Sequence, residues 1–253
     1  MTSHLNPSIS VDCVVFGFDG SNLKVLLVDF IDHSKTKNGL KAEEPLQKLP
    51  GMLILDEEDL DTAAYRALHQ YTNLENVYLK QFGVFSDPNR ISKPEDLLWI
   101  EEEYGTKVSR IVTVAYFALV KLHSNLLKSH AEAEVDWYKI DEVRNLAFDH
   151  KTILMKALST LTAQLLAEPI AFELLQKRFS IRQLQNVYEA ILGIEIDNRN
   201  FRKKVLKMPF LKPLDEKERL VAHKPAQLYK FDKHIYEKEA KKNKPQLNFI
   251  RFL

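Results

Sequence analysis

The sequence predicts an α+β fold with two domains, residues 1–166 and 167–253. Two features of the residue pattern support this fold class. β-rich runs with separate helices fill the first half, and short helices with capping signals follow Pro169. The third observation is charge, because residues 1–176 carry a net charge of −9 and residues 177–253 carry +10. An acidic body with a basic C-terminal part is typical of a protein in which one part binds nucleic acid, although a merely solvated basic domain is the alternative.

Two β-rich runs open the first domain, at residues 11–18 and 23–30. The polar residues between them, Asp19, Gly20, Ser21 and Asn22, predict a hairpin turn. Three further strands are expected at residues 77–84, 110–122 and 135–140, and two helices at residues 61–71 and 151–166. Strands mixed with separate helices indicate an α+β domain.

The composition excludes several classes of protein. A hydrophobic fraction of 45% is enough for packed cores and argues against a disordered chain. The longest uncharged apolar stretch, residues 111–120, is shorter than the roughly 20 residues that span a bilayer, and the first residues do not resemble a secretory signal. Cys13 is the only cysteine, and within a strand we expect it to be a buried apolar side chain. These observations predict a cytoplasmic protein with no membrane partner, no bound metal and no cofactor.

Residues 90–107 interrupt two predicted strands. They contain Leu97, Leu98, Trp99 and Ile100, followed by three glutamates. An insertion with apolar side chains is typical of a lid, a binding loop or an interface, and a short helix packed onto its own domain is the alternative.

The second domain has the pattern of a helix-turn-helix. Ser180 and Gln183 have the spacing of a capping box, and Gly193 marks the end of that helix. Asp197 would cap a second helix, whose expected core-facing residues are Phe201, Val205 and Met208. Short β-prone runs follow at residues 210–212, 220–222 and 228–231. Helix, turn, basic helix and hairpin are the layout of a winged helix-turn-helix.

The exposed face of the second helix would enter the major groove of DNA. Its arginines and lysines suit guanine edges and phosphates, and its asparagine suits adenine. The residues predicted to contact a double-stranded DNA operator are Ser180, Arg182, Gln183, Arg199, Asn200, Arg202, Lys203, Lys207, His223 and Lys224. Winged helices also bind proteins, so docking of an acidic protein partner is the alternative.

Residues 49–74, LPGMLILDEEDLDTAAYRALHQYTNL, carry the most informative motif. They resemble the Nudix box, G-x5-E-x7-R-E-U-x-E-E-x-G-U, where U is aliphatic. Aligned without gaps, Glu58 and Arg66 match the loop glutamate and the arginine of the box. The first glycine, the three metal-binding glutamates and the second glycine fall on Met52, Ala67, Gln70, Tyr71 and Asn73.

The departures from the box concern the residues that carry the chemistry. Nudix hydrolases cleave a diphosphate with magnesium held by carboxylates on one helical face, and magnesium requires hard oxygen ligands. Neither Ala67 nor Tyr71 has a carboxylate. The sequence therefore predicts that the chain is not an enzyme by the mechanism of that family. Glu58 and Arg66 are expected to tie the loop to the helix.

The segments EPIAFELLQKRFSIRQLQNVYEAILG, DNRNFRKKVLKMPFL and HKPAQLYKFD resemble the winged helix of Nudix-related transcriptional regulators. The combined resemblance covers nearly the whole chain. It implies a non-hydrolytic Nudix-like α/β/α sandwich domain that senses an effector, a C-terminal winged helix-turn-helix domain that binds DNA, and a homodimer. TNLENVYLKQFGVF and NLAFDH are similar to the arabinose-responsive branch. The other branch senses ADP-ribose-type nucleotides and governs nicotinamide metabolism.

The leading interpretation is a transcriptional regulator controlled by a small-molecule effector, a sugar such as L-arabinose. Carboxylates and an imidazole can bond hydroxyl groups while aromatic rings cover the apolar side of a sugar. The residues predicted to bind the effector are Phe85, Asp87, Trp137, Asp149 and His150. Asp149 could equally cap the following helix, and Trp137 could fill the core.

Three alternatives stand beside this interpretation. The first is an ADP-ribose-sensing regulator of nicotinamide metabolism. The second is a divergent Nudix hydrolase that acts on a nucleoside diphosphate derivative with other carboxylates. The third is a protein-binding scaffold, which a steep fall of DNA affinity with added salt would argue against.

Overall fold

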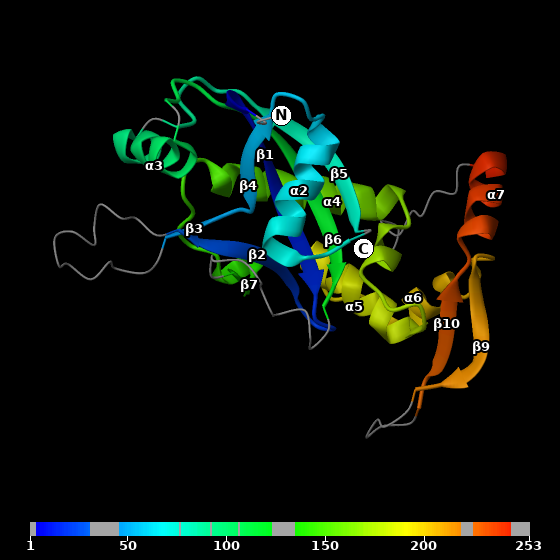
Figure 1. Ribbon diagram of the computed structural model, residues 1–253. Helices are drawn as coiled ribbons and strands as arrows, with labels where there is room; N and C mark the ends of the chain where they lie inside the picture. Colours follow the sequence, from blue (N-terminus) through cyan, green and yellow to red (C-terminus); the bar gives the residue numbers. More distant parts are fainter. Residues whose placement is uncertain are drawn as a thin grey trace. The chain divides into compact units, whose positions relative to one another are not determined.

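The structure, a computed structural model, describes residues 4–30, 46–75, 77–91, 93–105, 107–122, 135–218 and 225–243 (Figure 1). The chain divides into two compact units. Unit 1 comprises Met1–Gly17 and Lys24–Leu158, and unit 2 comprises Phe18–Leu23 and Ser159–Leu253. The division falls within helix α4 (His150–Ala167), whereas the sequence placed the domain boundary at the end of this helix. Within the described ranges, no helix is long and apolar enough to cross a membrane.

A β-sheet forms the centre of unit 1. Its described strands are β1 (Leu5–Phe18), β2 (Leu23–Phe30), β3 (Leu46–Lys48), β4 (Gly51–Leu55), β5 (Tyr78–Phe85), β6 (Val112–Lys121) and β7 (Val135–Lys139). They follow the order β3-β2-β1-β6-β5, with β4 also paired to β1 and β7 to β2. The pairs β1–β4, β2–β3, β2–β7 and β5–β6 are antiparallel. Because β1 and β6 lie in the middle, most of their residues are buried on both faces.

The turn between β1 and β2 is built by its polar residues. The Asp19 carboxylate accepts hydrogen bonds from the backbone N–H groups of Ser21 at 2.9 Å and Asn22 at 2.8 Å. Gly20 has φ +103°, a conformation that residues with a side chain rarely adopt. The two strands are neighbours in the sheet, which confirms the predicted hairpin.

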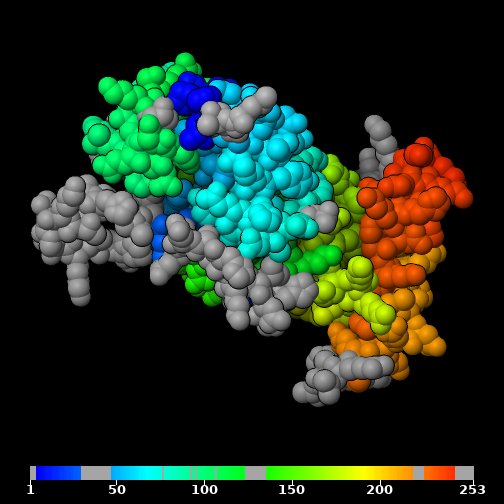
Figure 2. All heavy atoms as spheres, in the orientation of Figure 1, coloured from blue at the N-terminus to red at the C-terminus, as the bar shows by residue number. Residues whose placement is uncertain are grey.

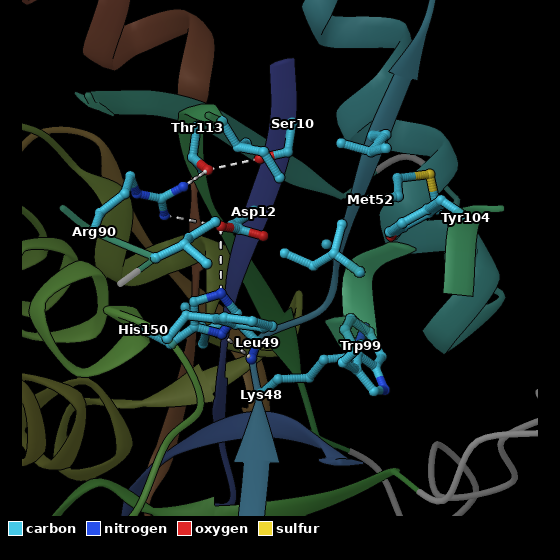
Figure 3. A pocket seen from close by; sticks show the side chains of 16 residues that line it. Ser10, Asp12, Lys48, Leu49, Met52, Arg90, Trp99, Tyr104, Thr113 and His150 are labelled. Atoms are coloured by element: carbon cyan, nitrogen blue, oxygen red, sulfur yellow. Dashed lines mark hydrogen bonds and ion pairs between the residues drawn. The ribbon is translucent and has the colours of Figure 1, made fainter. Parts of the chain in front are cut away.

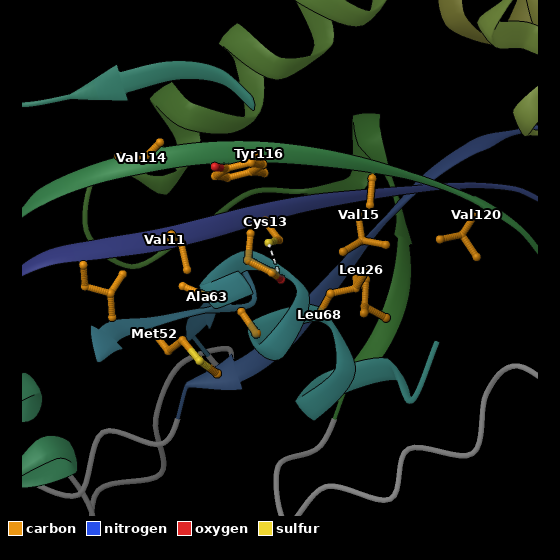
Figure 4. Close-up of a cluster of buried hydrophobic side chains, with 14 residues drawn as sticks. Val11, Cys13, Val15, Leu26, Met52, Ala63, Leu68, Val114, Tyr116 and Val120 are labelled. Atoms are coloured by element: carbon orange, nitrogen blue, oxygen red, sulfur yellow. Dashed lines mark hydrogen bonds between the residues drawn. The ribbon is translucent and has the colours of Figure 1, made fainter. Parts of the chain in front are cut away.

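Helices cover both faces of the sheet, with α2 (Leu60–Thr72) and the start of α4 on opposite sides in Figures 1 and 4. Asp59 caps α2 by accepting from the backbone N–H of Thr62 at 2.8 Å. The core under α2 includes Val11, Cys13, Val15, Met52, Ala63, Ala64, Ala67, Leu68 and Tyr116 (Figure 4). Burial raises the pKa of the Cys13 thiol, which agrees with the predicted apolar role.

Helix α3 (Pro94–Tyr104) forms from the predicted insertion. It has proline in its first turn and ends at Gly105, whose φ is +63°. Ile100 packs with Leu53, Val108 and Ile111 in a second small cluster, so the helix is packed onto its own domain. Figure 2 shows α3, in green, at the surface beside the first residues of β1.

Unit 2 is a small α+β domain. Its described elements after α4 are a 3₁₀ turn η2 (Ile170–Glu173), β8 (Phe179–Ser180), α5 (Ile181–Leu192), α6 (Asn198–Val205), β9 (Leu211–Lys217), β10 (Gln227–Phe231) and α7 (Lys233–Asn243). The strands form a sheet of order β8-β10-β9. Tyr188 of α5 and Phe201 of α6 meet edge to face in the core, with ring centroids 5.8 Å apart.

Most predicted elements are confirmed within a few residues. Strands β3, β4 and β8 and helix α7 were not assigned from the sequence, whereas α3 corresponds to the short helix given as the alternative for residues 90–107. A 3₁₀ turn, η1 (Ile140–Glu142), follows β7. Phe201 and Val205 are fully buried as expected. Met208 lies beyond the end of α6 and is only partly buried, because the helix is shorter than predicted. The predicted run at residues 220–222 lies outside the described residues.

Candidate functional site

A cavity lined mainly by apolar atoms, with several polar side chains, lies in unit 1, and the space among its lining residues is about 430 Å³, open solvent included (Figure 3). β1, β3, β4, β6 and α3 contribute to its wall, together with the residue that begins α4. Its polar lining consists of Ser10, Asp12, Lys48, Arg90, Thr113 and His150, and α3 adds the aromatic rings of Trp99 and Tyr104. A partly apolar cavity with a few convergent polar groups is the ordinary form of a small-molecule site.

Arg90 is held in the cavity wall by two acidic residues and a hydroxyl group. Its Nε and Nη2 atoms donate to the two carboxylate oxygens of Asp149 at 3.0 and 2.6 Å. Nη1 donates to Thr113 Oγ1 at 2.5 Å, and Nη2 lies 3.9 Å from Asp12 Oδ2. The guanidinium is therefore paired in the bidentate geometry that fixes its orientation.

Asp12 is the buried carboxylate at the centre of the site. His150 lies with Nε2 3.5 Å from Asp12 Oδ2, while its Nδ1 accepts from the backbone N–H of Leu49 at 2.9 Å. Burial alone would raise the pKa of Asp12, but His150, Arg90 and Lys48 outweigh it and hold this pKa below its ordinary value. The cavity thus contains a fixed negative charge surrounded by donors.

Lys48 lies at the other side of the cavity, and its side chain extends towards Trp99 in Figure 3. Only 6% of the residue is exposed. Its Nζ atom lies 4.7 Å from the centroid of the Trp99 ring and 3.4 Å from the hydroxyl oxygen of Tyr71. Its direct contacts in the described residues are aromatic, although Asp12 is close enough for the charge of Lys48 to help lower its pKa.

Glu58 and Arg66, which match the Nudix box, join the loop to helix α2. Arg66 Nε donates to Glu58 Oε2 at 3.0 Å, and Nη2 donates to the backbone carbonyl of Leu53 at 3.1 Å. Glu58 also accepts from the backbone N–H of Leu55 at 2.7 Å. Burial opposes ionisation of Glu58, but these hydrogen bonds and the charge of Arg66 lower its pKa. The predicted tie between loop and helix is confirmed.

The structure brings two of the five predicted effector residues to the cavity. His150 lines it, and the Asp149 carboxylate holds Arg90 instead of capping α4. Phe85 packs edge to face on Phe82 of the same strand. Asp87 accepts from the backbone N–H of Asn89 at 2.8 Å, and Trp137 packs against the core under α2. The effector-binding role of these residues remains a prediction.

The polar residues that sequence reasoning missed are Ser10, Asp12, Lys48, Arg90 and Thr113. One signal was available, because Asp12 interrupts a strand that is otherwise apolar from Val11 to Phe18. A carboxylate inside a buried run indicates a partner, since burial of an unpaired charge is costly. The partners themselves come from distant segments that only the fold brings together.

The second candidate site is in unit 2, on the helix pair α5 and α6. The predicted capping box is present: Ser180 Oγ accepts from the backbone N–H of Gln183 at 3.3 Å, and Gln183 Oε1 accepts from the backbone N–H of Ser180 at 2.8 Å. Asp197 caps α6 by accepting from the backbone N–H of Asn200 at 2.8 Å. Both helices therefore start where the sequence predicted.

The turn between the two helices is fixed by a buried amide. Gln185 is fully buried, and its Nε2 donates to Glu189 Oε1 at 2.9 Å and to the carbonyl oxygen of Ile196 at 2.8 Å. Glu189 Oε1 also accepts from the backbone N–H of Ile196 at 3.0 Å. Arg182 pairs with the other oxygen of Glu189 at 3.4 Å. This network holds the start of α6 at a defined position relative to α5.

The exposed face of α6 and of the turn that follows it is basic. Phe201 and Val205 point into the core, whereas Arg199, Asn200, Arg202, Lys203, Lys204 and Lys207 are exposed. Of the other predicted DNA contacts, Arg182 and Gln183 are exposed on α5, and Ser180 is buried in the capping box. His223 and Lys224 lie outside the described residues. Their contacts with DNA remain predictions.

These features define a Nudix-like domain with a cavity that contains several polar side chains, followed by a winged helix domain with a basic second helix. Residues 171–231 match the family model described as the NrtR DNA-binding winged helix domain. The crystal structure of NrtR from Shewanella oneidensis in complex with a 27mer DNA is similar to this chain. The two share 26% sequence identity with a TM-score of 0.68, over 88% of this chain and 93% of that one.

 A curated relative from Acinetobacter baylyi, described as the ADPR responsive transcriptional repressor NtrR, is 25% identical over 236 residues, with coverage of 92% of this chain and 85% of the relative. A MutT/nudix family protein from Enterococcus faecalis has 22% identity and a TM-score of 0.64, with coverage of 89% and 88%, which supports the fold alone. The two-domain architecture expected from the sequence is confirmed. The arabinose-responsive branch finds no support among these relatives.

Proposed function

We propose that this protein is a transcriptional repressor that binds double-stranded DNA through the winged helix domain of unit 2. The observation that carries the proposal is the exposed basic face of α6, in a domain that matches the NrtR DNA-binding winged helix model. The similar Acinetobacter baylyi protein is described as a transcriptional repressor, and the similar Shewanella oneidensis protein was solved with DNA. Hydrolysis is not proposed, because Ala67 and Tyr71 take the places of two metal-binding glutamates of the box, have no carboxylate and are buried.

The effector that we propose is ADP-ribose or a closely related nucleotide, bound in the cavity of unit 1. The Acinetobacter baylyi relative is described as ADPR responsive, which favours the ADP-ribose alternative over L-arabinose. The cavity supports the same choice. Lys48 and Arg90 are cations in its lining, and cations bind the phosphate groups that ADP-ribose has and arabinose lacks.

A repressor of this kind releases DNA when the effector binds one conformation of the protein more tightly than the other. We propose that the protein acts as a homodimer, because two recognition helices would read two half-sites of an operator. The effector would then favour a dimer geometry in which the helices no longer match both half-sites.

The test is binding of the full chain to a DNA fragment from the region upstream of its own gene, measured by gel shift and fluorescence anisotropy. We expect specific binding that ADP-ribose reverses and L-arabinose leaves unchanged. Specific binding that neither compound affects would contradict the proposed effector but would still support a DNA-binding repressor. Equal, weak binding to the operator fragment and to a shuffled fragment of the same length would contradict DNA recognition itself.

A further inference from the structure

The helix of the Nudix-like box does not fit the metal that the box implies. The three metal-binding glutamates of that family align with Ala67, Gln70 and Tyr71. Ala67 is completely buried in the core under the helix, and Tyr71 is 7% exposed and contacts Lys48. Across the residues that the structure describes, no group of three histidines, cysteines or acidic residues is placed to hold a metal ion. A diphosphate bound beside α2 therefore needs another source of positive charge.

Lys48 lies where that charge would be needed. Its Nζ atom is 3.4 Å from the hydroxyl oxygen of Tyr71, the residue that takes the position of the third glutamate in the box. The same lysine lines the cavity from β3. Lys48 thus contacts the face of α2 on which the Nudix box places its metal ligands, and it also lines the cavity that we assign to the effector.

The other nitrogen-bearing side chains of the cavity, Arg90 and His150, already have partners. Arg90 gives two hydrogen bonds to Asp149 and one to Thr113, and it also faces Asp12. His150 accepts from the backbone at Nδ1 and presents Nε2 to Asp12. Lys48 differs from both, because it contacts two aromatic residues and no described carboxylate. A buried ammonium group with no carboxylate in direct contact gains from an anion brought by a ligand.

We propose that Lys48 replaces the metal of the Nudix hydrolases and binds the diphosphate of the effector directly, so that effector binding requires no divalent cation. This inference rests on the proposed function for the identity of the effector. A phosphate oxygen that takes the ammonium group would also draw it away from the ring of Trp99 in α3. The fluorescence of Trp99 should therefore change when a phosphate group binds to Lys48.

The first experiment measures ADP-ribose binding to the full chain by titration calorimetry, once with excess EDTA and once with magnesium. We expect the same affinity in both conditions. Lys48→Met should weaken binding by about tenfold or more, since it removes a charged hydrogen-bond donor, and Lys48→Arg should retain most of the affinity. The control is Lys107→Met, because Lys107 is an exposed lysine of unit 1 that does not line the cavity. Binding that needs magnesium, or Lys48→Met binding as tightly as the unchanged chain, would overturn the proposal.

The second experiment does not depend on ADP-ribose being the effector or on the folding of a Lys48 variant. Trp99 and Trp137 are the two tryptophans of the chain, so Trp137→Phe leaves Trp99 as the single tryptophan reporter. Titration of this variant with inorganic pyrophosphate or ADP in EDTA should change its fluorescence, whereas sodium chloride at equal ionic strength should not. If pyrophosphate, ADP and sodium chloride all changed the fluorescence equally, the proposed role of Lys48 would be overturned, even if DNA release by ADP-ribose had been demonstrated. A specific signal without DNA release would contradict only the proposed effector.

Discussion

At the scale of single residues, Gly51 determines whether Asp12 can occupy the cavity. A Cβ atom on Gly51 would lie 1.9 Å from Asp12 Oδ1 and 2.9 Å from the carbonyl oxygen of Val11. We expect Gly51→Ala to lower the free energy of unfolding by about 1–3 kcal/mol, because the buried carboxylate must move from its partners. Urea denaturation followed by circular dichroism measures the change.

The matched control for this prediction is Gly83→Ala in β5, a strand of the same sheet that does not pair with β1 or β4. A Cβ atom on Gly83 would meet only the ring of Phe85 at 3.4 Å, which is an ordinary contact. This variant should stay close to the unchanged chain in stability. Equal stability of both variants would show that the packing of Gly51 against Asp12 is not tight in solution.

Glu58 gives a prediction that depends on pH. Its pKa is lower in the folded protein than its ordinary value of 4.5, so it stabilises the fold fully above pH 4.5 and loses this effect as the pH falls through the folded pKa. Glu58→Gln should therefore be less stable by about 1–3 kcal/mol at pH 7, with a difference that shrinks below pH 4.5. Thermal unfolding across this range measures it.

Glu57→Gln is the control, since Glu57 is an exposed neighbour in the same loop. It should have little effect on stability at any of these pH values. A Glu58→Gln variant whose deficit stays constant down to pH 3 would contradict an ionised Glu58 paired with Arg66.

The sequence predicts residues well where the partner is close along the chain. Glu58 and Arg66, Ser180 and Gln183, and Asp197 as an N-cap all follow from local spacing, and all are confirmed. The cavity could not be predicted in the same way. Arg90 meets Asp149 across 59 positions and Leu49 meets His150 across 101, and no periodicity encodes such pairs. Only the sheet brings these segments together.

At the scale of secondary-structure elements, α6 carries the prediction for DNA recognition. Lys203→Ala should weaken binding to all DNA sequences and reduce the slope of log affinity against log salt by about 1, as expected for a phosphate contact. Asn200→Ala, in the first turn of α6, should instead lower the preference for the operator over shuffled DNA. Anisotropy titrations at several salt concentrations separate the two effects.

Lys238→Ala on α7 serves as the control for charge alone, because Lys238 is an exposed lysine of the same unit outside the helix pair. We expect affinity and salt slope to be unchanged. If Lys238→Ala and Lys203→Ala reduced the salt slope equally, the basic charge of the whole unit, and not the face of α6, would account for DNA binding.

Elements with a strong periodicity or a capping signal were predictable, and elements held by tertiary contacts were not. β3 has three residues and β4 lies in a segment that was assigned only as a motif loop, so neither has the length for a pattern. Helix α3 has a weak apolar face because its two sides meet the cavity and the small cluster of Leu53 and Ile100. The charged helix α7 has few buried residues to indicate it.

At the scale of the whole molecule, the proposed homodimer predicts two chains on each operator. DNA that carries both half-sites, centred roughly 34 Å apart, should bind about 100-fold or more tightly than DNA with one half-site, because the second contact is intramolecular. Analytical ultracentrifugation of the complex gives the stoichiometry. One chain per operator with equal affinity for both DNAs would contradict the dimer.

The burial of Ala67 also restricts how this chain can change in evolution. A glutamate in place of Ala67 would put a carboxylate among the apolar side chains under α2, at a cost of several kcal/mol for an unpaired charge. A single substitution towards the hydrolase motif would thus damage the fold before it could provide turnover. If the chain binds ADP-ribose as proposed, this packing favours a protein that retains the effector intact over one that hydrolyses it.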